Sequence, residues 1–380
     1  KKSVALASLP SMARTISRSC TTKAVKPVRS AKMLGVPSGG GARRVIKDSK
    51  ARTRAFRLRI ARIHSMRRAG VRSAQLVRIA GTPMVTYGVE ILGMSDSHLE
   101  ESRRAIARAA SAEGGGKNFE MVLYALDGNA GTMDPAFDAH VLPIHAWAMA
   151  WWESWRRPDV LNNLVAKAVL KLATAAVSAW ALVVGPVTAL VASAIRIGWT
   201  FLDAHLLKDD LGAVWDLTLD PPIVVADAVK HSIRRWRLQR VLRHFPDSMP
   251  SVPDFVAPDR PQDEYDRGWS SDGANAIVLD FADIIARLLR PRSSGTKLFG
   301  DWAPCHKPAL LSAISGGQWP QARLAGTRKW TSEVQCQLCN ESVGTLEHRH
   351  MCPATMPGSG WQSPDAAAQS FMDTLSRDRL

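Results

Sequence analysis

The sequence predicts a mainly α-helical protein with a short β segment at its N-terminus and a small metal-binding module near its C-terminus. Apolar residues recur every three or four positions over several long stretches, which is the spacing of an amphipathic helix. Glycine, proline and serine punctuate these stretches where helices would begin or end. Three cysteines and a histidine crowd into residues 336–352, a pattern typical of a metal site rather than of a disulfide framework.

Positive charge is concentrated in the first third of the chain. The 380 residues carry a net charge of +16, from 50 Lys and Arg against 34 Asp and Glu. Residues 1–110 hold 24 Lys and Arg against 5 Asp and Glu, a balance of +19, so the other residues together carry −3. This asymmetry predicts a polyanionic partner for the N-terminal third, either nucleic acid or an acidic membrane surface.

Residues 1–42 combine short apolar runs with turn-forming residues. The runs at 4–7 and 31–36 predict two strands, and the sequence between them predicts a helix. The stretch 37–41, which reads Pro-Ser-Gly-Gly-Gly, predicts a flexible break before the next domain.

A long basic helix is predicted over residues 43–69, at the start of a helical domain that spans 43–112. Phe56, Ile60 and Ile63 recur at helical spacing and would face the core. Arginine outnumbers lysine here, and the planar guanidinium group suits bidentate contacts with phosphates. The candidate nucleic-acid-binding residues on the remaining helix surface are Arg52, Arg54, Arg57, Arg59, Arg62, Arg67 and Arg68.

Three shorter helices are predicted to complete this domain. One runs over residues 73–80, and the Gly-Thr-Pro sequence at 81–83 predicts the start of the next, with the proline in its first turn. Ser97 and Glu100 form a capping-box pattern that would open the last helix, which ends near residue 110. Four helices joined by tight turns predict a compact bundle.

Residues 113–246 predict a helical connection region. A glycine-rich loop opens it, and helices are expected over 134–157, 161–204 and 224–244. The last helix has an apolar line that faces a core, whereas its polar face either tracks phosphates or is simply solvated. The basic residues of that polar face are Lys230, Arg234, Arg237 and Arg240.

Four tryptophans lie close together near the end of the first of these helices. Spacings of three and four positions place them along one helix face, which favours packing into a core. Their neighbours Arg156 and Arg157 allow the alternative that the indoles stack on bases. The four are Trp147, Trp151, Trp152 and Trp155.

An uncharged stretch over residues 172–195 is long enough to cross a membrane. It is rich in alanine, and Gly185-Pro186 interrupts it at its midpoint, where the residue before a proline resists helix. Two buried helices joined by a Gly-Pro turn are therefore favoured, and a membrane-associated protein is the alternative. Residues 1–30 lack the apolar core of a secretory signal, so we expect a nuclear or cytoplasmic protein that is not secreted.

The most specific local pattern is C-x2-C-x8-H-x3-C, within a module that spans residues 331–356. Cysteine and histidine are the ligands that structural zinc prefers, and four protein ligands leave no open position for catalysis. Thr345 is a candidate N-cap for a short helix that would present the histidine and the last cysteine on one face. His350 is a rival ligand, and reduced cysteines without a metal are the alternative. The expected zinc ligands are Cys336, Cys339, His348 and Cys352.

The remaining segments offer no catalytic constellation. Residues 247–330 predict an exposed linker with one helix over 274–290, and residues 357–380 predict a flexible tail. Asp280 and Asp283 are not adjacent and lie in a helical context, so they do not match the paired aspartates of polymerases. Two-metal phosphoryl transfer needs several carboxylates that converge on the ions, and no other acidic cluster offers them.

Five segments follow one another in a characteristic order. They are the lysine-bearing start of the chain, residues 31–36 with their Leu-Gly pair, the arginine-rich helix, Tyr87-Gly88, and the late cysteine–histidine pattern. This order resembles the downstream half of reverse transcriptases from non-LTR, LINE-like retrotransposons. The resemblance covers most of the chain in patches, although residues 111–330 match no named module. The gap between the histidine and the last cysteine is one residue shorter than is common in that family, and its Phe/Tyr-Ala-Asp-Asp box is absent.

The resemblance implies that residues 1–42 are the end of a palm domain, with Leu34-Gly35 as the turn of its primer-grip hairpin. It implies a thumb domain over 43–112 and a C-terminal zinc knuckle. The parent family synthesises DNA on an RNA template. This chain lacks the catalytic aspartates, so we expect it to hold template–primer RNA or DNA and not to polymerise alone. A degenerate retroelement remnant without activity is the other alternative.

Overall fold

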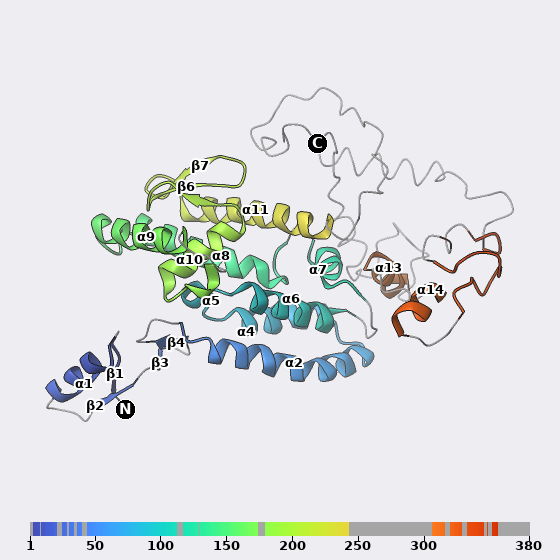
Figure 1. Ribbon diagram of the computed structural model, residues 1–380, viewed down its shortest axis with the longest axis horizontal. Helices are drawn as coiled ribbons and strands as arrows, with labels where there is room; N and C mark the ends of the chain where they lie inside the picture. Colours follow the sequence, from blue (N-terminus) through green and yellow to red (C-terminus); the bar gives the residue numbers. More distant parts are fainter. Residues whose placement is uncertain are drawn as a thin grey trace, which may run out of the picture. The chain divides into compact units, whose positions relative to one another are not determined.

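Helices dominate the protein, as the sequence predicts (Figure 1). The chain forms two compact units: unit 1 comprises Lys1–Gly114 and Asn118–Ser315, and unit 2 comprises Gly115–Lys117 and Gly316–Leu380. The computed structural model describes residues 3–111 and 117–242, apart from gaps at 8, 21–24, 29, 34–35, 40–43, 129 and 174–178. Nearer the C-terminus it describes residues 306–315, 320–328, 333–345, 348 and 352–355.

Two small strand pairs open unit 1. β1 (Ser3–Ala5) and β2 (Val25–Pro27) pair in parallel and are connected through α1 (Pro10–Ser19). β3 (Ser30–Met33) and β4 (Val36–Gly39) pair antiparallel, with Met33 opposite Val36. The expected first strand and the helix after it are confirmed by β1 and α1. A single strand over 31–36 is wrong, because Met33 ends β3 and Val36 begins β4, and β2 was not predicted. The expected break at 37–41 is wrong for residues 37–39, because a proline is tolerated in the edge strand of a two-stranded pair, where its missing N–H costs little.

The basic helix is α2 (Lys47–Arg68), which buries Phe56 and the two isoleucines predicted to face the core. It is followed by α3 (Ser73–Leu76), the π-helical turn η1 (Val77–Gly81) and α4 (Thr82–Thr86). The expected start of a helix at 81–83, with the proline in its first turn, agrees with α4, but the three elements run on without the expected turn between them. Gly81 keeps a helical φ of −72°, and a β-carbon there would lie 2.8 Å from the Phe56 ring. Glycine is therefore needed here for close packing and not for a turn.

The helical bundle is completed by α5 (Val89–Leu92) and α6 (Asp96–Ala110), and α6 packs along α2 (Figure 1). The predicted capping box at Ser97 is wrong, because α6 begins at Asp96 with Ser95 at its N-cap position. Asp96 lies in the first turn, where a carboxylate interacts favourably with the helix dipole, and it forms a 2.9 Å ion pair with Arg196.

The second half of unit 1 contains α7 (Phe119–Asp127), α8 (Pro135–Trp152), α9 (Pro158–Ala173), the 3-10 turn η2 (Ala179–Ala181), α10 (Pro186–Arg196) and α11 (Pro222–Leu242). The helical stretch expected over 161–204 is interrupted at the favoured Gly-Pro turn, because Pro186 starts α10 after Gly185 at its N-cap. The uncharged stretch 172–195 is thus divided among α9, η2 and α10. Among the described residues, no helix combines the length and apolar character that a membrane span requires.

A three-stranded antiparallel sheet lies between α10 and α11 in the sequence. Its order is β5 (Thr200–Phe201), β6 (Leu206–Lys208) and β7 (Val214–Asp216), and the sequence analysis missed it. Strands of two or three residues are too short to show an alternating pattern.

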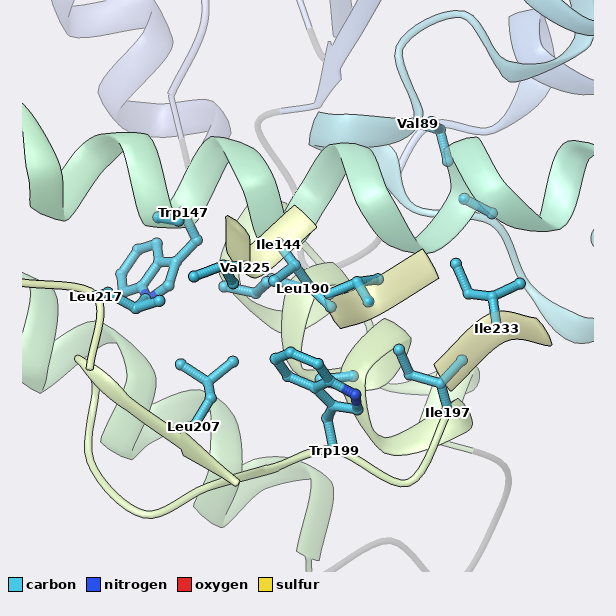
Figure 2. Packing of buried hydrophobic residues seen from close by; sticks show 14 of the residues in the cluster. Val89, Ile144, Trp147, Leu190, Ile197, Trp199, Leu207, Leu217, Val225 and Ile233 are labelled. Atoms are coloured by element: carbon cyan, nitrogen blue, oxygen red, sulfur yellow. The ribbon is translucent and has the colours of Figure 1, made fainter. Parts of the chain in front are cut away.

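The two largest apolar cores of the described residues lie in unit 1. Phe56, Ile106 and Leu123 belong to the core beneath α2 and α6. The larger core is built on α8, α10 and α11, and Figure 2 shows the indoles of Trp147 and Trp199 among its aliphatic side chains. Both indole N–H groups are satisfied, since Trp147 donates to the Ala204 carbonyl and Trp199 to the Ser232 hydroxyl, each at 2.8 Å.

Fewer residues are described beyond α11. α13 (His306–Ile314) belongs to unit 1, whereas α14 (Gln321–Arg323) and the π-helical turn η5 (Leu324–Arg328) belong to unit 2. The glycine-rich loop at 112–116, the helix expected over 274–290, the aspartates 280 and 283, and the tail 357–380 lie outside the described residues.

Candidate metal centre and basic helix

The structure brings the four predicted metal ligands of unit 2 together. One ligand atom from each lies within 4.8 Å of all the others. The Sγ atoms of Cys336 and Cys352 are 3.8 Å apart, and Cys339 Sγ lies 3.2 Å from His348 Nε2. Both Cys336 and Cys352 are buried. Three thiols and an imidazole at these distances form a cluster that could bind a metal ion.

Backbone hydrogen bonds shape the loop that carries the first two cysteines. Cys336 N–H donates to the Ser342 carbonyl, and the Cys336 carbonyl accepts from Asn340 N–H, both at 2.8 Å. Asn340 adopts a φ of +56°, a left-handed conformation that asparagine tolerates better than most residues. The two thiols are therefore presented from one tight turn, as the C-x2-C spacing predicts.

The histidine is positioned by a helix cap. His348 is helical, and its N–H donates to Thr345 Oγ1 at 3.0 Å, which confirms Thr345 as an N-cap. The rival ligand, His350, lies outside the described residues. The imidazole thus reaches Cys339 from a fixed backbone position.

The local environment favours the thiolate form of one ligand. Hydrogen bonds from the backbone N–H groups of Cys339 and Leu338 lower the pKa of Cys336 to about 6, whereas burial raises the pKa of Cys352. A thiolate is the form of cysteine that coordinates metals.

The candidate nucleic-acid-binding arginines of α2 fall into two groups. Arg52 and Arg67 are half-buried and serve the fold. Arg52 donates to the Tyr87 carbonyl at 2.9 Å with its guanidinium 4.7 Å from the centre of the Tyr87 ring, and Arg67 donates to the Ala110 carbonyl at 3.0 Å. The exposed members are Arg54, Arg57, Arg59, Arg62 and Arg68.

Two lysines that the sequence analysis passed over extend this surface. Lys47 and Lys50 are exposed in the first turns of α2, two turns and one turn before Arg54, respectively. We call these lysines and the five exposed arginines the α2 basic face. Glu101 of α6 pairs with Arg57 of this face at 2.7 Å. The periodicity of the apolar residues could have identified both lysines, because they lie opposite the buried stripe.

The basic helix near the C-terminal end of unit 1, α11, uses part of its predicted polar face internally. Its apolar line packs into the larger core as expected. Arg237, however, is only 2% exposed, and its Nε lies 3.3 Å from Asp134 Oδ2. Arg240 Nε donates to Glu120 at 2.7 Å. The interpretation of these two arginines as a phosphate-tracking or solvated surface is wrong. Arg237 pairs with Asp134 at the start of α8, and Arg240 pairs with Glu120 of α7.

A buried charge network, formed by Arg103, Asp134, Arg237, Asp127 and Glu120, joins α6, α7, α8 and α11. Arg103 Nε and Nη2 each donate to Asp134 at 2.9 Å in a bidentate pair. Burial alone would raise the pKa of Asp134, but the two guanidinium groups lower it below its usual value. Burial raises the pKa of Asp127, which lies 3.8 Å from Arg237. Sequence reasoning missed the network because its members are far apart in the chain.

Comparison with models of known protein families, with curated proteins and with solved structures finds no match to this chain.

Proposed function

We propose that this protein binds nucleic acid through the α2 basic face and that the cysteine–histidine cluster of unit 2 holds a structural zinc ion. The observation that carries the proposal is the solvent-facing half of α2, where two lysines and five arginines are exposed along 22 residues. A helix of this length extends about 33 Å, which matches roughly ten phosphate steps of one duplex strand at ~3.4 Å each.

The composition of this surface favours phosphates over other polyanions. Arg54, Arg59 and Arg62 are exposed guanidinium groups, and a guanidinium fork matches the geometry of phosphate oxygens. An acidic membrane would also attract positive charge, but binding there is strengthened by apolar side chains that enter the lipid. Leu58 is the one large aliphatic residue of α2 that is mostly exposed, at 78%. A phosphate backbone is therefore the better partner.

Zinc fits the donor set and the spacing of the cluster. Tetrahedral zinc with Zn–S bonds of ~2.3 Å places its sulfur ligands about 3.8 Å apart. The Cys336–Cys352 separation of 3.8 Å agrees with this value. Cys336, Cys339, His348 and Cys352 would hold the ion, and four protein ligands leave no site for substrate. The ion would supply folding free energy to a segment too short to form a core.

The same features support the proposal that the chain is the downstream part of a non-LTR retrotransposon reverse transcriptase. The β3–β4 pair flanks Leu34-Gly35, the expected primer-grip turn, and α2 follows directly as the first thumb helix. The role left to such a segment is to hold the template–primer duplex by its phosphates, without reading sequence. Polymerisation by this chain alone is not expected.

The dependence of binding on salt tests the proposed duplex grip. We would replace Arg54, Arg57, Arg59 and Arg62 with glutamine and measure the affinity for an RNA–DNA hybrid over a range of salt concentrations. The slope of log K against log salt is negative, and each lost phosphate contact reduces its magnitude by ~0.9, so the slope should become less steep by about 3 to 4.

The matched control replaces the same four residues with lysine, which keeps the charges and should leave the slope nearly unchanged. A glutamine variant with the slope of the parent protein would refute the assignment of α2. Zinc content is measured independently by metal analysis of the purified chain, where one ion per chain is expected.

A further inference from the structure

The turn between α8 and α9 exposes two tryptophans that the fold does not need for its core. Residues 152–160 are all exposed, and the side chains of Trp152 and Trp155 are 47% and 53% exposed. Trp151 and Trp147, one and two turns before Trp155, are each only 8% exposed and belong to the larger core. The prediction that all four pack into a core is therefore wrong for the last two. Large exposed aromatic groups often mark binding surfaces.

A well-formed helix end holds this turn in place. Trp155 N–H donates to the Ala150 carbonyl at 3.0 Å, and Ser154 N–H donates to the Trp151 carbonyl at 3.1 Å. This is the hydrogen-bond pattern of a Schellman motif. Its left-handed position is usually glycine, but here Ser154 adopts a φ of +51°. The motif thus fixes the backbone of the tight turn that carries Trp152 and Trp155.

The ring of Trp155 is also held in place, and two arginines follow it in the chain. Trp155 Nε1 donates to Glu153 at 2.6 Å, which restricts the plane of the indole. Arg156 and Arg157 follow directly and are both exposed. The acidic residues of the turn are occupied, since Glu153 binds the indole and Asp159 pairs with Arg157 at 2.9 Å.

We propose that this turn is a binding platform for single-stranded nucleic acid, in which unpaired bases stack on Trp152 and Trp155 and phosphates contact Arg156 and Arg157. The proposal rests on the proposed function of the chain as a nucleic-acid-binding protein and adds a second site to it. Exposed indoles favour unpaired bases because the base faces in a duplex are already stacked on one another. The α2 basic face would thus bind double-stranded nucleic acid, and the turn at residues 152–160 would bind single strands.

The test compares two probes on the full chain. We would measure the fluorescence anisotropy of labelled oligo(dT) and of a labelled RNA–DNA hybrid. The double variant Trp152→Ala/Trp155→Ala should lose about tenfold or more in affinity for oligo(dT). Its affinity for the hybrid should stay within about twofold of the parent value. The double variant with phenylalanine at both positions keeps an aromatic face and should retain most of the oligo(dT) affinity.

The outcomes separate this proposal from the proposed function. Unchanged oligo(dT) affinity in the double alanine variant, with a reduced salt slope in the α2 glutamine variant, would overturn the platform and leave the duplex grip intact. A parent chain that binds neither probe would overturn both. Equal losses for both probes would also overturn the platform. The platform would likewise be overturned if the double alanine variant lost affinity for phosphatidylserine vesicles but not for oligo(dT), because the turn would then be a membrane contact.

Discussion

Replacing Asp134 with asparagine should destabilise unit 1 by about 3–5 kcal/mol, because it leaves two buried arginines without their shared counter-ion. Asp134 is 1% exposed and accepts two hydrogen bonds from Arg103, while Arg237 lies 3.3 Å away. Asparagine keeps the shape of the side chain. It also keeps an oxygen to accept the 2.9 Å hydrogen bond from Ala136 N–H that caps α8. The substitution therefore keeps the cap of α8, but it removes the negative charge and puts an NH2 donor where Asp134 Oδ2 accepts from Arg103 and faces Arg237.

The matched control is a solvent-exposed ion pair that also joins an arginine to a carboxylate. Glu101 and Arg57 are bonded at 2.7 Å, but their side chains are 42% and 57% exposed. Solvent screens this pair, so Glu101→Gln should cost less than about 1 kcal/mol. The comparison between the two variants measures how much burial contributes to the effect of losing one carboxylate.

Urea unfolding monitored by circular dichroism and tryptophan fluorescence gives both free energies. The measurements should be made at neutral pH. Because the pKa of Asp134 is lowered in the folded protein, the carboxylate stabilises the fold fully above its unfolded-state pKa, near 4. This stabilisation is lost as the pH falls below that value. If Asp134→Asn and Glu101→Gln cost the same within error, the buried charge network does not stabilise the packing of α6, α8 and α11.

Three further predictions follow from particular contacts. Zinc chelation, or the substitution Cys339→Ser, should make unit 2 sensitive to protease while the unfolding of unit 1 is unchanged; equal protease resistance with and without zinc would contradict the structural role. Burial lowers the pKa of His98 to about 4 and of His140 to about 3. The unfolded chain therefore binds more protons below pH ~6.5, and stability should fall on acidification by about 1.4 kcal/mol per pH unit for each histidine; a urea midpoint unchanged down to pH ~5 would exclude this. Gly131→Ala should cost about 2–4 kcal/mol, since φ is +63° and the new β-carbon would meet a phenylalanine ring at 2.5 Å. Gly212→Ala is its control, because φ is +96° but the nearest atom is 3.6 Å away, so a loss equal to that at Gly131 would contradict the steric argument.

The sequence by itself determined the features that are encoded locally. The apolar residues of α2 recur at helical spacing, so its buried stripe and its basic face are both predictable from neighbours one turn apart. The metal cluster is likewise local, because its ligands lie within one short segment and only a tight turn and a helix cap are needed to bring them together. Such features can be predicted from the sequence because they depend only on the geometry of residues that are close together in the chain.

Only the tertiary structure decided whether a residue is buried or exposed, and with which charge it pairs, where its partners lie far away in the chain. Arg237 looks like a member of a polar helix face, but carboxylates about a hundred positions earlier surround it and bury it. Trp151 and Trp152 are neighbours in one helix, yet one enters the core and the other faces solvent. Which side of a helix is covered, and by which charge, is set by the elements that pack against it, and no local pattern contains that information.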